Sequence, residues 1–221
     1  MVKIIDGKKL AEKIKNDIVK EILKINDNCL PAKKRPNLAI IIIGERQDSM
    51  LYVDLKEKEA KKVGLDIHTY KCPENISEKK VYEMIDCLNK DKLIDAILVQ
   101  LPLPSGFDTD GIIRAIDPAK DVDRFHPDNL EILFSTCNHN HVMPPVFQVV
   151  LEILKSINYN IQNKKIYLIS NSNIFGNSLV KVLACQGAKA KALRVQDIDL
   201  AEKTKKADIL ITAIGRPGFI K

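Results

Sequence analysis

The clearest indication of the fold is the apolar run Leu-Ala-Ile-Ile-Ile-Ile at Leu38–Ile43, which ends at Gly44. The run is short and rich in β-branched residues, and this combination favours a strand that is buried on both faces of a parallel sheet. The next segment, Ser49–Val63, is predicted to form a helix that ends at Gly64, because glycine commonly follows the last helical turn. A buried strand followed by a helix is the repeating unit of an α/β fold.

The same alternation continues on both sides of this unit. Apolar residues recur at helical spacing before it and predict an amphipathic helix at Leu10–Ile25. The other expected elements are, in chain order, a strand at Asp66–Tyr70, a helix at Glu78–Leu88, a strand at Ala96–Gln100, a helix at Pro145–Ile157, a strand at Lys165–Ile169, a helix at Asn173–Gln186, and strands at Ala188–Leu193 and Asp208–Ile214.

Strands that alternate with helices in this way form parallel sheets with right-handed crossovers. We therefore predict an α/β protein made of two α/β units with parallel sheets, at residues 1–140 and 141–221. The second unit is expected to be a Rossmann-like nucleotide-binding domain. A cleft between two such units is a common place for a small substrate and a cofactor to meet.

Composition excludes several classes of protein. Hydrophobic residues make up 45% of the 221 residues and charged residues 29%, a balance that argues against a disordered chain and against a membrane protein. The net charge is +6, but basic residues stand next to acidic ones, as in Lys56–Glu59. Aromatic residues make up only 5% and there is no Trp, so we expect no nucleic-acid partner.

The five cysteines are odd in number, scattered, and contain no Cys-x-x-Cys pair: Cys29, Cys72, Cys87, Cys137 and Cys185. This pattern argues against a disulfide framework and against a zinc site, and it favours a reducing compartment. His139–His141 is too short a group to predict a metal site. The charged N-terminal segment Met1–Lys9 lacks an apolar signal core, so the cytoplasm is the predicted location.

Tyr52 and Lys56 stand four residues apart on the predicted helix 49–63, so both side chains project from one face. A lysine that is partly buried beside polar groups can have its pKa lowered, and it can then exchange protons near neutral pH. The alternative, which spacing alone leaves open, is a solvated helix face.

Two further stretches carry polar groups where parallel sheets place ligands. Gln100 opens the segment Gln-Leu-Pro-Leu-Pro at the end of a predicted strand, and it could hold a lysine or a substrate amide, or simply end the strand. Asp121 and Asp123 lie in one loop with His126. The two carboxylates could bind a metal, orient an amino-bearing ring or cap a helix, and His126 is expected to make structural hydrogen bonds.

The segment Lys165–Gly176 is predicted to be a strand, a turn and the start of a helix, where backbone N–H groups can bind a pyrophosphate. Only Gly176 remains of a three-glycine dinucleotide fingerprint. Arg194 follows the next strand, at the place where dinucleotide folds distinguish a ribose hydroxyl from a 2′-phosphate. A cation there favours NADP, and a solvated loop arginine is the alternative.

Together these motifs resemble the methylenetetrahydrofolate dehydrogenase/cyclohydrolase family in order and spacing. The resemblance rests on Tyr52-Val-x-x-Lys56, on Ile97-Leu-Val-Gln100-Leu-Pro-Leu-Pro104 and on Lys120-Asp-Val-Asp123-x-Phe-His-Pro127. Shorter matches stand near both ends, at Ile4–Lys8 and Ala207–Pro217.

The resemblance implies an enzyme that oxidises 5,10-methylenetetrahydrofolate with NADP, or with NAD as the other possibility, and hydrolyses the methenyl product to 10-formyltetrahydrofolate. It implies a folate-binding first unit and a homodimer. Lys56 would handle the proton, Gln100 would hold Lys56, and Tyr52 would pack on the folate. The other implied site residues are Asp123 for the pterin ring, Leu101 and Pro102 lining the cleft, and Ser170, Asn171, Ser172, Arg194 and Gly215 for the cofactor.

The departures from the family pattern lie on the cofactor side. Ser170-Asn171-Ser172 stands where the family has Gly-Arg-Ser, and Arg194-Val195 stands where it has His-Ser. The alternative function is therefore a cyclohydrolase without NADP binding, or an impaired paralogue that acts as a dimer partner. The match ends at Lys221 where relatives continue, so the chain is expected to be a fragment or a shortened relative.

Overall fold

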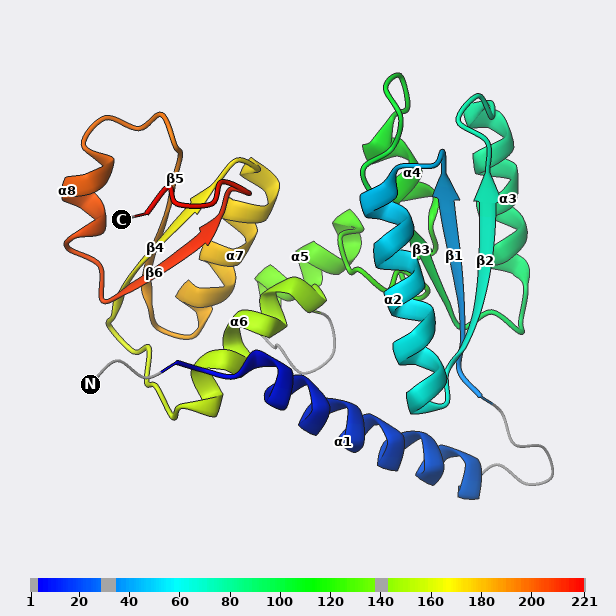
Figure 1. Cartoon of the computed structure of the whole chain (residues 1–221), viewed down its shortest axis with the longest axis horizontal. Coiled ribbons are helices and arrows are strands. Elements are labelled where there is room, and N and C mark those ends of the chain that lie inside the picture. The colour runs from blue at the N-terminus through cyan, green and yellow to red at the C-terminus, as the bar shows by residue number, and fades with distance from the viewer. Residues whose placement is uncertain (1–3, 29–34, 138–142, 221) are drawn as a thin grey trace. The chain divides into compact units, whose positions relative to one another are not determined.

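The structure is a computed structural model that describes residues 4–28, 35–137 and 143–220. Cys29 and His139–His141 lie outside these residues. Contacts within the chain divide it into two compact units, Met1–Pro127 and Asp128–Lys221, called unit 1 and unit 2 below (Figure 1). The domain boundary at residue 140 stays a prediction.

Unit 1 contains a three-stranded parallel sheet with the order β2-β1-β3 (Figure 1). Its strands are β1 (Asn37–Ile43), β2 (Asp66–Cys72) and β3 (Ala96–Val99). In the register of the sheet, Leu38 of β1 lies beside Ile67 of β2 and beside Ala96 of β3. The predicted parallel α/β arrangement is therefore confirmed for this unit.

Strand β1 is buried on both faces, because helices cover both sides of the sheet. Ala39, Ile41 and Ile43 belong to one cluster with residues of α3 (Glu78–Lys90) and α4 (Thr109–Ala115). Ile40 and Ile42 pack on the other face against Val53 of α2 (Gln47–Val63). The continuous apolar run at Leu38–Ile43 is thus needed for a strand between two helical layers.

The helices of unit 1 end and begin at residues that suit those positions. Helix α2 ends at Gly64, which has a φ of 85° and whose N–H donates to the carbonyl of Ala60. Helix α4 is capped by Asp108, whose side chain accepts a 3.0 Å hydrogen bond from the N–H of Gly111. Sequence periodicity did not predict α4, because a seven-residue helix offers too few turns for an apolar pattern.

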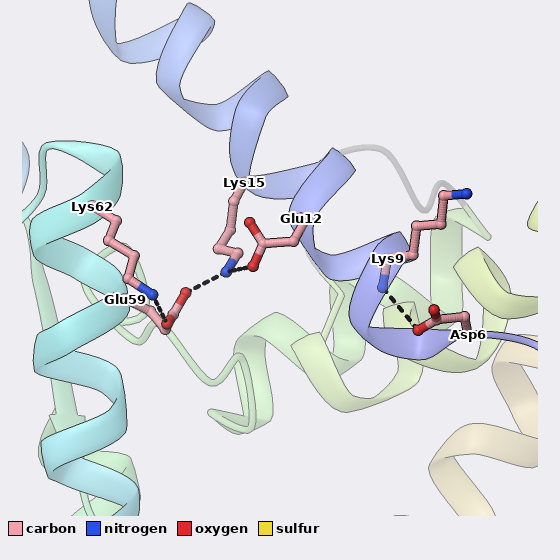
Figure 2. Close-up of polar contacts among 6 residues, drawn as sticks. All are labelled: Asp6, Lys9, Glu12, Lys15, Glu59 and Lys62. Atoms are coloured by element: carbon pink, nitrogen blue, oxygen red, sulfur yellow. Dashed lines mark hydrogen bonds and ion pairs between the residues drawn. The ribbon is translucent and has the colours of Figure 1, made fainter.

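Helix α1 (Gly7–Asn28) is joined to α2 by charged and apolar contacts. Figure 2 shows Lys15 of α1 between Glu12 and Glu59, and Lys62 reaching Glu59 from one turn further along α2, at 2.7 Å. Ile22 of α1 is 8% exposed and adds an apolar contact to unit 1. The predicted amphipathic helix is present, and Glu59 is its main polar contact with α2.

Unit 2 contains a second three-stranded parallel sheet, with the order β5-β4-β6 (Figure 1). Its elements are α5 (Pro127–Thr136), α6 (Pro145–Ser156), β4 (Lys165–Ser170), α7 (Asn173–Cys185), β5 (Lys189–Leu193), α8 (Leu200–Thr204) and β6 (Ile209–Ala213). Helix α7 packs on β4 and β5, and it buries Leu179, Val182 and Leu183. Helices α5 and α8 were not predicted.

A disulfide between Cys137 and Cys185 joins the residue after α5 to the last residue of α7. One helical turn before each cysteine, the ammonium group of Lys181 lies 4.5 Å from the ring centroid of Phe134. The prediction that the cysteines form no disulfide framework is therefore wrong for this pair. Cysteine number and spacing do not report which residues the fold brings together. Cys72 and Cys87 are free thiols.

Candidate active site

Lys56 lies on the half-buried flank of α2, on the same side of the helix as the buried residues Val53 and Ala60. Its Nζ donates a 3.0 Å hydrogen bond to Oε1 of Gln100, which follows β3. Two motifs that stand 44 residues apart in the sequence are therefore in direct contact.

Gln100 is fixed on both sides of this contact. Its backbone N–H donates to the carbonyl of Ile41 in β1 at 2.8 Å, which continues the hydrogen bonding of the sheet beyond the end of β3. Its Nε2 donates to the carbonyl of Leu101 at 2.7 Å. Because Nε2 is engaged there, Oε1 is the end of the amide that faces Lys56, and an oxygen can accept from either an ammonium group or a neutral amine.

Asp123 lies on a segment that is held against the edge of β3. The N–H of Ile97 donates to the carbonyl of Lys120 at 2.7 Å, and the N–H of Val122 donates back to the carbonyl of Ile97 at 3.4 Å. Asp121 forms a parallel bridge with Ile97. Gln100 and Asp123 are therefore both positioned by the same strand.

The charges of Lys56 and Asp123 influence each other. Burial lowers the pKa of the Lys56 ammonium group, and the Asp123 carboxylate acts in the opposite direction. Burial raises the pKa of the Asp123 carboxyl, Lys56 lowers it, and Asp121 raises it. Burial is the largest cause in both cases, so the pKa of Lys56 lies below its ordinary value and that of Asp123 lies above it.

Three further predicted substrate residues lie next to these polar groups in the sequence. Tyr52 stands one turn before Lys56 on α2 and is 60% exposed. Leu101 is 40% exposed and Pro102 is also exposed, directly after Gln100. An exposed ring and exposed apolar groups beside a half-buried lysine suit a flat aromatic substrate. Their assignment to folate binding stays a prediction.

The predicted cofactor turn of unit 2 is closed by its own hydrogen bonds. Ser170 Oγ donates to the carbonyl of Ser172 and accepts from the N–H of Ser172, both at 3.1 Å. Ser172 caps α7 by accepting from the N–H of Phe175 at 3.2 Å. Asn171 Nδ2 donates to the carbonyl of Ile214, which follows β6, at 3.1 Å. The turn is thus tied both to α7 and to the end of β6.

A dinucleotide fits this end of unit 2 in two respects. The turn leads into the N-terminus of the 13-residue helix α7, where backbone N–H groups and the helix dipole favour a phosphate. Gly176 lets α7 approach β5 closely, since a Cβ at this position would lie 3.4 Å from the Cβ of Ala192. This close packing is the function of the third glycine in dinucleotide fingerprints.

Arg194 and Gly215 follow two different strands of the same sheet. Arg194 comes directly after β5 and is exposed, and Gly215 follows β6 with a φ of 62°. Both therefore stand beyond the carboxyl ends of parallel strands, as the sequence predicted, and this is the edge at which such sheets bind ligands.

Two polar residues of unit 1 are more deeply buried than the sequence indicated: Ser49, which was not a candidate, and Asp121, which was considered only together with Asp123. Ser49 is 4% exposed, and within the part of the chain that the structure describes its Oγ has no hydrogen-bond partner. Asp121 is 3% exposed, and its Oδ2 accepts a 2.8 Å hydrogen bond from the N–H of His126. Burial of polar groups this complete could not be read from composition. His126 is also hydrogen-bonding as expected, with Nε2 3.3 Å from the carbonyl of Arg114.

Two hollows on the described surface lie away from these side chains. One of about 670 Å³ lies at the carboxyl ends of β1 and β2, and one of about 640 Å³ lies along α6. Neither is lined by Lys56, Gln100 or Asp123. In the described ranges 4–28, 35–137 and 143–220, no group of three His, Cys, Asp or Glu side chains is arranged to hold a metal ion, and no helix is long and apolar enough to cross a membrane.

Comparison with known families agrees with this arrangement. The sequence pattern described as the catalytic domain of tetrahydrofolate dehydrogenase/cyclohydrolase matches residues 5–123. The pattern of the NAD(P)-binding domain of the same family matches residues 144–221. The chain belongs to the tetrahydrofolate dehydrogenase/cyclohydrolase family. The resemblance inferred from the three motifs is therefore confirmed.

Relatives of this dehydrogenase/cyclohydrolase chain are named bifunctional protein FolD. The protein from Geotalea daltonii is 37% identical over 226 residues, which cover 100% of this chain and 77% of the relative. The protein from Nitratiruptor sp. is 38% identical over 221 residues, which cover 99% of this chain and 76% of the relative. The chain thus spans about three quarters of the length of these relatives.

Solved structures agree with the fold of this dehydrogenase/cyclohydrolase chain. FolD from Campylobacter jejuni has a TM-score of 0.88 and 31% identity, and the match covers 95% of this chain and 73% of that one. FolD from Trypanosoma brucei, solved with NADP and an inhibitor, has a TM-score of 0.93 and 28% identity. This match covers 99% of this chain and 74% of that one. The predicted α/β fold with a nucleotide-binding unit is therefore confirmed.

Proposed function

We propose that this chain oxidises 5,10-methylenetetrahydrofolate to the 5,10-methenyl form with NADP and hydrolyses the product to 10-formyltetrahydrofolate. The observation that carries the proposal is the 3.0 Å contact between Lys56 and Gln100, in a chain of this family. A lysine with a lowered pKa, held by an amide oxygen, can both accept and return a proton.

In the hydrolytic step, water adds to the methenyl carbon and gives one proton to the neutral amine of Lys56. The C–N5 bond of the resulting carbinolamine then breaks as its hydroxyl becomes the formyl carbonyl and releases its proton to solvent. N5 takes up the proton that the Lys56 ammonium group returns, so one proton is released in the whole reaction. Gln100 Oε1 keeps Nζ in one position through both transfers, because it can accept from the charged and the neutral lysine.

Asp123 is proposed to bind the pterin ring. An ionised carboxylate has two oxygens that accept the adjacent N–H groups of an amino-pyrimidine edge, and this pairing fixes the orientation of the ring. Tyr52 is proposed to pack on the flat part of the folate, and Leu101 and Pro102 to contact its apolar edge. The exposure of Tyr52 and Leu101 supports these assignments, because their surfaces are open to a ligand.

In the oxidative step, a bound NADP supplies the hydride acceptor. Ser170, Asn171 and Ser172 are proposed to hold the pyrophosphate at the start of α7, and Gly215 to line the same edge. Arg194 is proposed to bind the 2′-phosphate, since a guanidinium can pair with a phosphate through two N–H groups. Hydride transfer needs no acid from the protein, so binding and alignment are the tasks of these residues.

A homodimer, a cytoplasmic location and a domain boundary at residue 140 are also proposed for the chain. Family membership supports both the homodimer and the location. Size-exclusion chromatography with light scattering measures the oligomeric state, and a mass of one chain would contradict the dimer.

The deciding experiment assays both half-reactions of the purified chain, with NADP and with NAD. Hydrolysis of 5,10-methenyltetrahydrofolate and cofactor-dependent oxidation of the methylene form are both expected. Cofactor binding is measured separately by thermal shift, since a ligand that binds the native state raises the melting temperature. Hydrolysis without any shift by NADP or NAD would favour a cyclohydrolase alone, and the absence of both reactions would overturn the proposal.

A further inference from the structure

We propose that Asp121 is a positioning residue, whose buried carboxylate holds the turn that presents Asp123 and sets the pH range in which Asp123 binds the pterin ring. The inference rests on the proposed function, in which Asp123 contacts the substrate. Asp121 itself would touch no substrate and would act through Asp123.

The carboxylate of Asp121 closes the turn that follows it. Its Oδ2 accepts a 2.8 Å hydrogen bond from the N–H of His126, five residues further on. Asp123 lies inside this loop. Arg124, next to it, has a φ of 59°, in a region of backbone space that glycine adopts far more readily than arginine. A turn with such a residue needs outside support to keep its shape, and the Asp121 hydrogen bond spans it.

The same segment is also anchored at its beginning. Lys120 Nζ donates to the carbonyls of Leu88 and Asp91, at 2.9 and 2.7 Å, at the end of α3. Asp121 forms its bridge with Ile97 in β3. Because the backbone of Asp121 is fixed against β3, its side chain holds the N–H of His126, at the end of the turn, in a fixed position relative to that strand.

Asp121 also acts on Asp123 through its charge. Two carboxylates that are two residues apart, one 3% exposed and the other half-buried, repel each other when both are ionised. Lys56 on α2 is the opposing positive charge, and the four residues of β3 are apolar. The pKa of Asp123 is therefore determined by burial, by the charge of Lys56 and by the charge of Asp121.

The other charged groups of this segment are directed to backbone carbonyls. Arg124 Nη1 donates to the carbonyl of Pro118 at 3.1 Å, and Lys120 is bound at the end of α3. His126 Nε2 lies 3.3 Å from the carbonyl of Arg114. Asp121 is thus the group of this segment whose charge is expected to act most strongly on Asp123.

The sign of the effect follows from these charges. A carboxylate near Asp123 makes ionisation of Asp123 harder, so removing that charge lowers the pKa of Asp123. The pterin ring binds to the ionised form. Loss of the Asp121 charge should therefore extend substrate binding to lower pH, whereas a purely structural defect would weaken binding at every pH.

The first test is Asp121→Asn, which removes the charge and retains a side-chain oxygen for the N–H of His126. The dissociation constant of tetrahydrofolate is measured against pH by fluorescence titration, because binding does not require the neutral amine of Lys56. The acidic limb of binding is expected to move down by about one pH unit. Asp121→Glu keeps the charge on a longer side chain, so its limb should stay in place while binding weakens. Asp110→Asn, on the exposed first turn of α4, is the matched control and should change neither quantity.

An acidic limb that stays in place in a folded Asp121→Asn protein, or that moves equally in Asp121→Glu, would overturn the inference. A second measurement needs no activity. The carboxyl carbons of the wild-type chain, Asp121→Asn and Asp121→Glu are titrated by ¹³C NMR, and the Asp123 signal is assigned by its loss in Asp123→Asn. The titration midpoint of Asp123 is expected to fall in Asp121→Asn and to stay in place in Asp121→Glu, and an unchanged midpoint in Asp121→Asn contradicts the inference. If the wild-type chain hydrolyses nothing but the midpoint falls in Asp121→Asn, the proposed function fails and the charge effect stands.

Discussion

Lys56 and Gln100 stand 44 positions apart in the chain, and Nζ of Lys56 donates a 3.0 Å hydrogen bond to Oε1 of Gln100. Helix α2 carries the first residue and the end of β3 carries the second. The orientation of the Gln100 amide is fixed by its bond to the carbonyl of Leu101, so this contact presents an acceptor to the lysine. The side chain that fixes the position of the Lys56 ammonium group therefore carries no charge.

Lys56→Met should abolish hydrolysis of 5,10-methenyltetrahydrofolate. Removal of a general acid or base typically costs about 100-fold or more in kcat, and methionine retains most of the apolar stem of the side chain. Initial rates of the purified variant measure the effect. Lys58→Met, at an exposed position on the same helix, is the control and should keep wild-type activity. Normal turnover by a folded Lys56→Met protein contradicts the assigned role.

Gln100→Glu should move the pH dependence of hydrolysis upward. A carboxylate in contact with Lys56 would favour its charged form and raise its pKa, against the lowering that burial causes. The neutral amine that accepts a proton from water is then populated only at higher pH. The pH profile of kcat shows the change. Gln100→Leu should instead lower kcat without moving the acidic limb of the pH profile upward. Identical pH profiles of kcat for Gln100→Glu and Gln100→Leu would contradict this explanation.

Cys185→Ser should destabilise unit 2. The Cys137–Cys185 bond closes a loop with a sequence separation of 48, for which the chain-entropy account gives about 4 kcal/mol. Urea unfolding followed by circular dichroism measures the loss. A reductant should lower the wild-type midpoint to that of the variant and leave the variant unchanged. Cys87→Ser, at an exposed free thiol, is the control. Equal midpoints for Cys185→Ser and the oxidised wild type would show that the bond does not contribute.

Glu59→Gln should loosen α1. Hydrogen bonds from Lys15 and Lys62 lower the pKa of the Glu59 carboxyl from 4.5 to about 2. A carboxyl whose pKa is lower in the folded state than in the unfolded state stabilises the fold at any pH above its unfolded-state pKa. For Glu59, this stabilisation is lost as the pH falls from 4.5 toward about 2.

Amide hydrogen exchange in α1 measures this effect, after correction for intrinsic rates. Faster exchange is expected for Glu59→Gln near neutral pH and for the wild type once Glu59 is protonated. Glu21→Gln, at an exposed position on α1, should exchange as the wild type does. The Glu59 side chain is 40% exposed, so the effect is expected to be local rather than global.

The long elements of the fold were predictable from local sequence. The continuous apolar run at Leu38–Ile43 predicts a strand that is buried on both faces, as it is in β1. Gly64 marks the end of α2. Helices α4, α5 and α8 have 7, 10 and 5 residues, and they depend on capping and on tertiary contacts more than on an apolar repeat. Sequence periodicity is weakest for helices of this length.

The candidate site could be predicted only in part. The four-residue spacing of Tyr52 and Lys56 places both on one helix, but nothing in that spacing indicates that Gln100 accepts from Lys56. That pairing came from the family resemblance, which combines segments far apart in the chain. The Cys137–Cys185 bond and the burial of Asp121 arise from tertiary packing, and no local sequence pattern predicts either of them.

Ile97 exchanges backbone hydrogen bonds with Lys120 and Val122, and it stands three residues before Gln100 on the same strand end. The amide that holds Lys56 and the carboxylate at Asp123 therefore take their positions from one strand of unit 1. A substitution that displaces β3 would therefore move the hydrogen-bond acceptor of Lys56 and the Asp123 carboxylate together. The Ser170–Ser172 turn makes its hydrogen bonds within unit 2, so the same substitution would leave that turn in place.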